Sequence, residues 1–318
     1  MREATVRRAD LRFRLGLNLR SVVGRAYPRV IGANREPSWL IFEVFLPLLG
    51  IAAYVFIYQA FYQAQAAAIC PSPCTPTPAQ LLALHQAGQN LNALVATVVL
   101  GGTMVAFWLN VLWSMASQLY WEKEIGNLQL YMMAPMNRMA LLGGMAIGGV
   151  FMTSVRAIST LVAGVLVFGV VFQVADPLML LAVFFVTLVA LYGLGMFFAS
   201  LYLLWGREAW NVSALLEEPI FFSSGFYFPL GGLFNYGGWG SVVGIVGSII
   251  PAGLGLDALR QLTLGQTAFG GKFWVLSAPV ELEILLVLAI GFLVLARYAL
   301  AYLELLAKRE GKLTSRHQ

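Results

Sequence analysis

Six long apolar runs constrain this chain more than any other feature, because a helix needs roughly 20 apolar residues to cross ~30 Å of hydrocarbon. The chain has 318 residues, 59% hydrophobic and 11% charged, whereas about a quarter of the residues in a soluble domain are charged. Lipid offers backbone amides no partner, so each run is predicted to be helical. The predicted class is all-α and polytopic, with spans at about 39–62, 92–117, 140–172, 178–205, 209–230 and 280–303.

Basic residues are unevenly distributed between the loops, and this predicts the orientation. One side holds both termini and the second and fourth loops, with Arg2, Arg7, Arg8, Arg12, Arg14, Arg20, Arg25, Arg29, Arg35, Lys123, Arg138, Arg207, Arg297, Lys308, Arg309, Lys312 and Arg316. The other side holds Arg260 and Lys272. By the positive-inside rule, both termini are predicted to be cytoplasmic in a cell-membrane protein. The net charge of +5 then reflects topology, and no nucleic-acid partner is expected.

A single transmembrane domain, residues 1–318, is predicted. Within residues 1–38, a basic amphipathic helix on the inner leaflet is favoured over a solvated tail, because apolar residues recur at helical spacing at Leu11, Leu15, Leu19, Val22 and Ala26. Residues 39–230 hold spans one to five, 279–303 span six and 304–318 a cytoplasmic tail. Residues 231–278 are predicted to be extracellular or re-entrant, because Gly244, Gly247 and Pro251 interrupt their apolar stretch.

The two cysteines, Cys70 and Cys74, lie in the predicted first outer loop, about residues 63–91, which contains no Asp, Glu, Lys or Arg. They would face an oxidising compartment, so they form either a local disulfide or free thiols. A metal site is disfavoured because only His85 supplies a further nitrogen ligand there.

The sequence lacks the patterns of an enzyme or a nucleotide-binding protein. His85 and His317 have no plausible nucleophile and acid around them. The stretch "GQTAFGGKF" places Phe273 where a Walker A loop needs Ser or Thr to bind magnesium. The chain is therefore predicted to be no enzyme and to bind no cofactor itself.

Three charges fall inside predicted spans: Arg156 in the third, and Glu217 and Glu218 in the fifth. Each costs about 2.5–3.5 kcal/mol at mid-bilayer on insertion scales, so it should face protein or water rather than lipid. We hypothesise that Arg156 pairs with one of the glutamates, within the chain or across a subunit interface. The pair would either orient helices or contact a substrate.

Between the second and third spans, the stretch "WEKEIGNLQLYMMAP" predicts a surface-seeking helix. Its apolar stripe is Trp121, Ile125, Leu128 and Met132, and Pro135 would end it. That stripe would be satisfied equally by lipid or by the groove of a soluble partner.

The same stretch resembles a motif of ATP-binding-cassette (ABC) type-2 exporter permeases, E-x-G-T-x-E-x-L-x-x-x-P. "EIGNLQLYMMAP" supplies Glu124, Gly126, Leu128, Leu130 and Pro135, and departs from the motif at Asn127 and Gln129. "REPSW" and "PLLG" are similar to the entry to that family's first span, "SGFYFP" to the end of its fifth, and "PAGLGLDALRQ" to its outer segment before the sixth. Together these matches are spread over almost the whole chain.

The resemblance implies a permease subunit that pairs with a second one, identical or paralogous, and docks a cytoplasmic ATPase; two ATPases per complex would bind ATP and magnesium. It assigns the ATPase-coupling role to Trp121, Glu122, Glu124, Gly126, Leu128, Met132 and Pro135. It implies an extracellular gate or lid at Ser224, Gly225, Phe228, Pro229, Asp257 and Arg260, although for Asp257 and Arg260 local capping and pairing is favoured over that role.

The main rival interpretation is an ion channel or proton-coupled carrier gated by Arg156 with Glu217 and Glu218. An intramembrane enzyme is disfavoured because no catalytic set is present. Apolar spans are what contact with membrane lipid demands, so they do not identify a cargo. Glycolipid, polysaccharide, peptide, antibiotic and haem-like substrates all stay open.

Overall fold

The computed structural model describes residues 2–34, 37–71, 73–134, 136–205, 208–265, 269 and 273–309. Within these ranges the regular structure is helical and includes no β-strand. Several residues used for sequence predictions lie outside the described residues: Arg35, Pro135, Arg207, Lys272, Lys312, Arg316 and His317.

Among the described residues, five helices are long and apolar enough to cross a membrane. They are Phe45–Ile69 within α2 (Pro37–Ile69), Pro78–Glu124 from α3 (Pro78–Leu109) through α4 (Gln118–Glu124), α6 (Arg138–Leu166), Pro177–Tyr202 within α7 (Pro177–Trp205) and α11 (Ala278–Arg309). These correspond to five of the six predicted spans. The chain is an all-helical, multi-pass membrane protein.

The remaining predicted span, 209–230, is shorter than expected. Helix α8 (Ala209–Ser223) has 15 residues, which is about 22 Å at 1.5 Å per residue and less than the hydrocarbon thickness. It ends because the chain turns after Ser223, where Gly225 has a φ of 63°. Beyond that turn, α9 (Gly238–Ile249) and α10 (Pro251–Leu264) meet at 93°, as in a broken span or a re-entrant loop.

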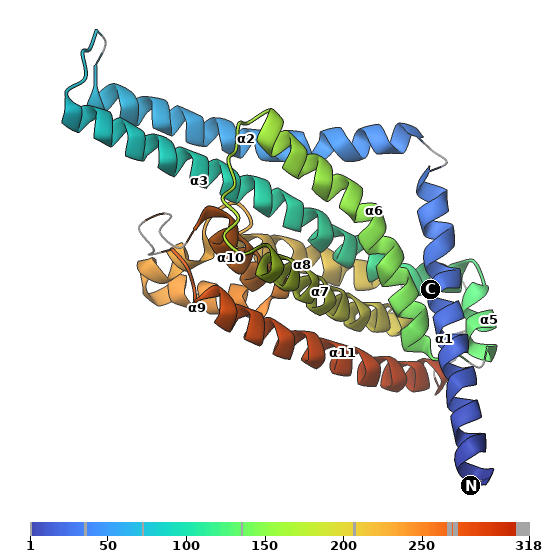
Figure 1. Cartoon of the computed structure of the whole chain (residues 1–318). Helices are drawn as coiled ribbons and strands as arrows, with labels where there is room; N and C mark the ends of the chain where they lie inside the picture. Colours follow the sequence, from blue (N-terminus) through green and yellow to red (C-terminus); the bar gives the residue numbers. More distant parts are fainter. Residues whose placement is uncertain are drawn as a thin grey trace.

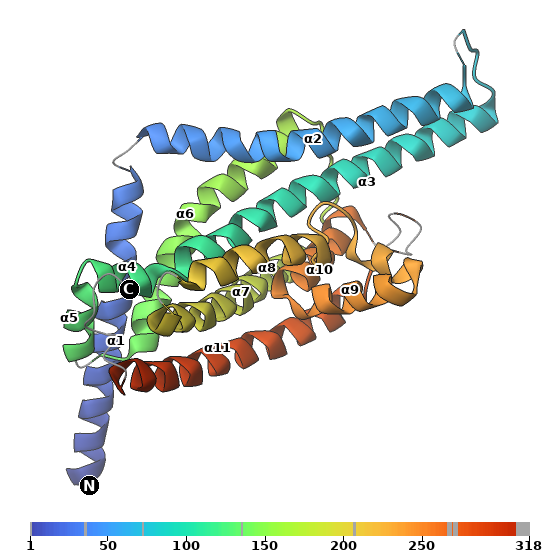
Figure 2. The same cartoon turned by 180° about the vertical axis from the view of Figure 1, so that it is seen from behind.

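The helices are arranged around two distinct ends (Figures 1 and 2). At one, called the α1 end here, α1 (Arg2–Asn34) runs across the bundle beside α5 (Asn127–Met133), the start of α6 and the last turns of α11. At the opposite end, α2 and α3 project beyond the other helices as an antiparallel hairpin, near α9 and α10. Sites at the two ends are therefore separated by the length of the spans.

Two predicted boundaries differ from the structure at the opposite end. Most of the predicted loop 63–91 is helical, because α2 continues to Ile69 and a capping box starts α3, with Gln80 N donating to Thr77 Oγ1 and Thr77 N to Gln80 Oε1. Helix α6 ends at Leu166 rather than near residue 172. The chain then reverses at Gly169, whose φ is 67°.

Glycines allow α1 to approach α6 closely. A Cβ at Gly144 would lie 2.6 Å from the Val22 carbonyl oxygen, and one at Gly148 would lie 3.1 Å from the Arg29 side chain. The predicted apolar stripe of α1 is divided: Val22 and Ala26 pack against α6 at these glycines, whereas Leu15 and Leu19 are exposed. Helix α1 thus carries one face for α6 and leaves a second, partly apolar face open.

Candidate functional site

The segment between the second and third spans is two short helices rather than one. Helix α4 ends at Glu124, and α5 begins at Asn127, because Gly126 adopts a left-handed φ of 85° that breaks the helix. The predicted single stripe is therefore divided. Leu128 is buried and Met132 half-buried, whereas Trp121 is 47% exposed, Ile125 62%, Leu130 61% and Met133 75%. These last four residues are called the loop patch below.

Charged residues of the segment face inward rather than outward. Glu122 is buried and forms an ion pair with Arg25 of α1, and its second oxygen accepts a hydrogen bond from Asn127 Nδ2 at 3.1 Å. Glu124 is half-buried at the last position of α4. Glu122, which the resemblance assigns to ATPase coupling, ties α4 to α1.

The far side of the segment is tied to α11. Arg138, the first residue of α6, donates from Nε to Glu304 Oε2 at 2.9 Å and to Met132 Sδ at 3.3 Å. Lys308 forms a second ion pair with the same glutamate. The segment α4–α5 is therefore held by α1 at one side and by the end of α11 at the other.

Aromatic rings join this segment to α8. The ring of Trp210, near the start of α8, makes edge contacts with Trp121 at 6.0 Å, Tyr120 at 6.4 Å and Trp113 at 6.4 Å between centroids. Such contacts add about 0.5–1.5 kcal/mol each beyond burial. A displacement of α4 would consequently move α8 through these ring contacts.

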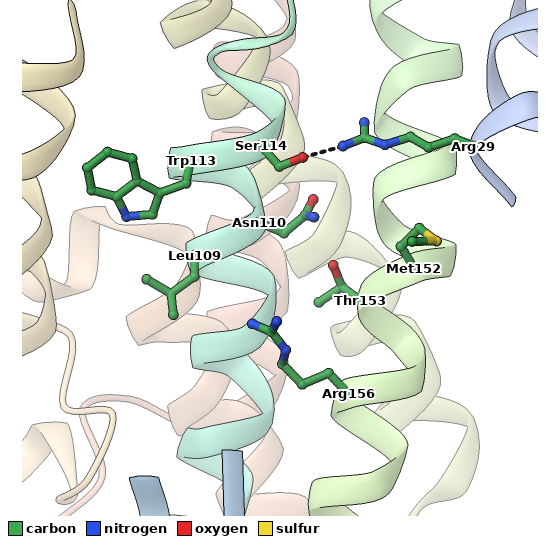
Figure 3. A pocket seen from close by; sticks show the side chains of 8 residues that line it. All are labelled: Arg29, Leu109, Asn110, Trp113, Ser114, Met152, Thr153 and Arg156. Carbon is green, nitrogen blue, oxygen red and sulfur yellow. Dashed lines mark hydrogen bonds between the residues drawn. The ribbon is translucent and has the colours of Figure 1, made fainter. Parts of the chain in front are cut away.

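A π-helix, η1 (Asn110–Met115), interrupts the long helix between α3 and α4 and borders a pocket of about 400 Å³ (Figure 3). π-Helical turns are rare and are frequent at functional sites. The pocket is lined by Arg29, Leu109, Asn110, Trp113, Ser114, Met152, Thr153 and Arg156. Arg29 of α1 and Arg156 of α6 thus lie in one pocket with the polar side chains of Asn110, Ser114 and Thr153.

Arg29 is tied into this pocket from outside the spans. Its guanidinium donates to Ser114 Oγ and, at 3.3 Å, to the Met145 carbonyl oxygen. Burial lowers the pKa of Arg29 from its ordinary value, while the nearby Tyr192 opposes that shift. Tyr192 in turn donates to Asn110 Oδ1 at 2.9 Å. The π-helix is therefore linked by hydrogen bonds to α1 and α7, and the sequence offered no sign of this.

The intramembrane glutamates lie on α8, on the side of η1 away from α6. Trp113 Nε1 donates to Glu217 Oε2 at 2.9 Å, and Figure 3 shows the Trp113 ring projecting away from Arg156. Glu217 is thus hydrogen-bonded to Trp113, on the side of η1 away from Arg156. Glu218 is exposed. The hypothesised pairing across a subunit interface stays a prediction.

At the opposite end, Arg260 organises the turn that follows α8. This arginine of α10 is fully buried and donates to four backbone carbonyl oxygens: Gly225 at 2.8 Å, Phe226 at 2.7 Å, Phe228 at 3.0 Å and Thr97 at 2.9 Å. Gly101 of α3 makes room, because a Cβ there would lie 1.5 Å from the Phe226 carbonyl oxygen. The predicted gate residues Ser224, Gly225, Phe228 and Pro229 are thereby brought onto α3 and α10.

The hydrogen bonds of Asp257 hold the start of α11 and do not involve the side chain of Arg260. Its Oδ2 accepts from Val275 N at 2.9 Å and from Gln261 Nε2 at 3.3 Å. The same Gln261 Nε2 lies 3.1 Å from Glu281 Oε2, and Glu281 Oε1 accepts from Leu276 N at 3.1 Å. Sequence reasoning missed Gln261 and Glu281, which complete this buried polar cluster.

The tip of the α2–α3 hairpin is closed by a disulfide between Cys70 and Cys74. Within the described residues, no group of three or more His, Cys, Asp or Glu side chains is arranged to hold a metal ion. In comparisons with known proteins, no family model matches the chain and no curated protein matches it.

Proposed function

We propose that this chain is the membrane-spanning permease subunit of an ATP-driven exporter of the ABC type-2 kind. The observation that carries the proposal is the loop patch, Trp121, Ile125, Leu130 and Met133: exposed apolar side chains on a segment that contacts α1, α6 and α8. Contiguous exposed apolar surface rimmed by polar residues marks a contact site. A cytoplasmic ATPase, which would bind the ATP and magnesium, is the proposed partner there.

The charge distribution supports the orientation. Arg14, Arg20, Arg25 and Arg29 of α1 lie at the same end as Arg138, Lys308 and Arg309. By the positive-inside rule this end faces the cytoplasm of a cell membrane, so the loop patch is accessible to a soluble ATPase. Helix α8 with its following turn serves as the fifth of six spans, and α9–α10 as a re-entrant pair.

A second permease subunit, identical or paralogous, is proposed to cover α8. Its exposed residues recur at helical spacing, namely Asn211, Ala214, Leu215, Glu218, Pro219 and Phe222. A carboxylate such as Glu218 should face protein or water rather than lipid. The translocation path would then run along this face, between the two subunits.

The path of mechanical coupling follows from the contacts. ATP-driven movement of the loop patch would be transmitted to α8 through the Trp210 contacts and to α3 through the continuous helix of Pro78–Glu124. By linkage, a ligand bound to the spans would change ATP turnover through the same coupling free energy.

The test is ATP hydrolysis by the native complex, purified from membranes with its ATPase and placed in nanodiscs. Leu130→Ser with Met133→Ser should lower copurified ATPase and membrane-dependent hydrolysis at least about fivefold, because about 1–3 kcal/mol of apolar contact is lost. The matched control is Leu81→Ser with Leu82→Ser, which changes two exposed leucines at the opposite end. The proposal would be refuted if the two double variants had equal effects, or if the purified complex contained no ATPase.

The rival function is an ion channel or proton-coupled carrier, and the pocket beside η1 with Arg29 and Arg156 is the observation that favours it. This function predicts flux into liposomes that contain the chain alone. Arg156→Gln would then change the flux while no ATPase is present. Absence of flux, together with ATP-dependent activity of the complex, decides for the exporter.

A further inference from the structure

A polar cleft of about 640 Å³ lies at the opposite end, between the α2–α3 hairpin, the α6–α7 loop and the end of α10. Its volume falls within the ~300–1,000 Å³ of typical small-molecule sites. The polar lining comprises Tyr62, His85, Gln89, Asn90, Asn92, Gln173 and Thr263. No Asp, Glu, Lys or Arg is among the described residues that line it.

The absence of charge extends over the outer part of the hairpin. Residues 63–91 contain no Asp, Glu, Lys or Arg, although most of the described ones are exposed and the hairpin tip projects from the bundle (Figures 1 and 2). Exposed protein surface ordinarily carries many charges. Here amides, hydroxyls and a histidine supply the polarity instead, so the cleft suits an uncharged, polar ligand.

One wall of the cleft is fixed in place by backbone hydrogen bonds. Asn92 Nδ2 donates to the Val171 carbonyl oxygen at 3.1 Å, and Val171 N donates to Asn92 Oδ1 at 3.0 Å. Gln173 N donates to the Thr263 carbonyl oxygen at 2.8 Å. Because these backbone groups are already used, a peptide would find little free edge to extend.

The side chains of Asn90 and Gln173 have no hydrogen-bond partner in the described part of the chain, and each amide offers both donors and an acceptor. Gln89 and His85 lie 3.1 Å apart and present further polar atoms. A hydroxyl group likewise donates and accepts, and the C–H face of a sugar ring packs well on an aromatic ring such as that of Tyr62.

We propose that this cleft binds an uncharged saccharide. A phosphate, carboxylate or ammonium group would find no opposite charge among the described lining residues, whereas hydroxyl groups both donate and accept, as the amides do. The site is separate from the ATPase contact and from the face of α8, so the proposal holds or fails independently of the exporter function.

Two sources of saccharide are compatible with the site. The α6–α7 loop separates the cleft from an apolar cavity of about 410 Å³: Val171 and Gln173 line the cleft, while Phe172 and Val174 line the cavity, as alternation along an extended segment requires. Thr263 borders both spaces. A free glycan would use the cleft alone, and a glycolipid would place its headgroup there and an acyl chain in the cavity.

The experiment uses the full chain, without ATPase, in phosphatidylcholine nanodiscs. Binding of maltotriose, cellotriose and N,N′,N″-triacetylchitotriose is followed by saturation-transfer NMR and titration, and monoglucosyl diacylglycerol in the nanodisc tests the lipid-linked source. Asn90→Ala with Gln173→Ala should weaken binding about tenfold, as expected for the loss of two or more hydrogen bonds. Gln63→Ala with Gln86→Ala, exposed amides outside the cleft, is the matched control.

Binding of a soluble trisaccharide that the Asn90 and Gln173 variants weaken supports the proposal with a free glycan as the source. Binding of the glycolipid alone, with the same loss, supports it with a membrane source. The proposal is overturned if neither form binds, or if both variant pairs have equal effects. Tighter binding of triglycine or of glucose 6-phosphate in this cleft would overturn it as well.

Discussion

An arginine secures the chain at each end of the molecule, but the two arginines bind different partners. At the opposite end, Arg260 is fully buried and donates to four backbone carbonyl oxygens. At the α1 end, Arg25 is 24% exposed and pairs with the Glu122 carboxylate, next to apolar side chains that the described residues leave exposed.

The difference between the partners of these two arginines indicates which end can move. Backbone carbonyls have no alternative rotamer, so the turn Ser224–Pro229 keeps one position unless α10 moves with it. A partly exposed ion pair contributes little, typically ~0.2–1 kcal/mol, and can open at small cost. The opposite end is thus a rigid frame, and α4–α5 is a segment that a partner is able to displace.

The largest effect is expected for Arg260→Met. Loss of the guanidinium leaves four carbonyl oxygens unpaired in the interior, so the free energy of unfolding should fall by about 3–5 kcal/mol. Denaturant unfolding of the purified chain in mild detergent, followed by tryptophan fluorescence, measures this change. Arg297→Met, an exposed arginine of α11, is the control and should change stability by less than ~0.5 kcal/mol. A loss below ~1 kcal/mol for Arg260→Met would contradict the rigid frame.

A somewhat smaller effect is expected for Gly101→Ala, which tests the same frame from α3. The added Cβ would collide with the Phe226 carbonyl oxygen and push the turn away from Arg260. Overpacking of this kind costs about 1–3 kcal/mol. Gly143→Ala is the matched control, because a Cβ there meets nothing within 4 Å and alanine favours the helix. Equal melting temperatures of the two variants would show that the turn is not held against α3.

Local sequence patterns could predict the elements but not their partners. Hydropathy located five spans because lipid imposes one length and one composition on a helix. It overestimated the length of the fifth span, because the apolar run continues through Phe226 and Phe228 although Gly225 turns the chain. The sequence stays apolar beyond the end of the helix. The end of the helix is visible only in the backbone geometry.

The candidate site shows the same limit more sharply. The sequence placed the α4–α5 segment correctly between two spans, but treated Gly126 as part of a continuous helix. It also gave no sign of the Arg25–Glu122 pair, because Arg25 is distant in sequence and no local pattern links them. The Arg260 contacts, the η1 pocket and the Gln261–Glu281 cluster all depend on such long-range contacts.

A third prediction concerns the Arg25–Glu122 pair itself. Arg25→Gln and Glu122→Gln should each lower the free energy of unfolding, and the double variant should reveal a coupling of about 1 kcal/mol that shrinks in high salt. The reversed pair, Arg25→Glu with Glu122→Arg, should restore part of that stability. Additive single effects in this cycle would mean that the two charges do not interact, and α1 would then be held to the segment by packing and by the Arg25–Tyr131 contact.

The smallest effect on stability is expected for substitutions in the loop patch, although their effect on ATPase contact should be large. Leu130→Ser with Met133→Ser changes side chains that are already exposed in the isolated chain, so its free energy of unfolding should change by less than ~0.5 kcal/mol. Denaturant unfolding of the chain without ATPase measures this. Near-neutral stability combined with lost ATPase contact would show that the loop patch serves a partner rather than the fold. A loss above ~2 kcal/mol would instead assign these side chains to the fold of the chain itself, and the contrast between a rigid end and a docking end would no longer hold.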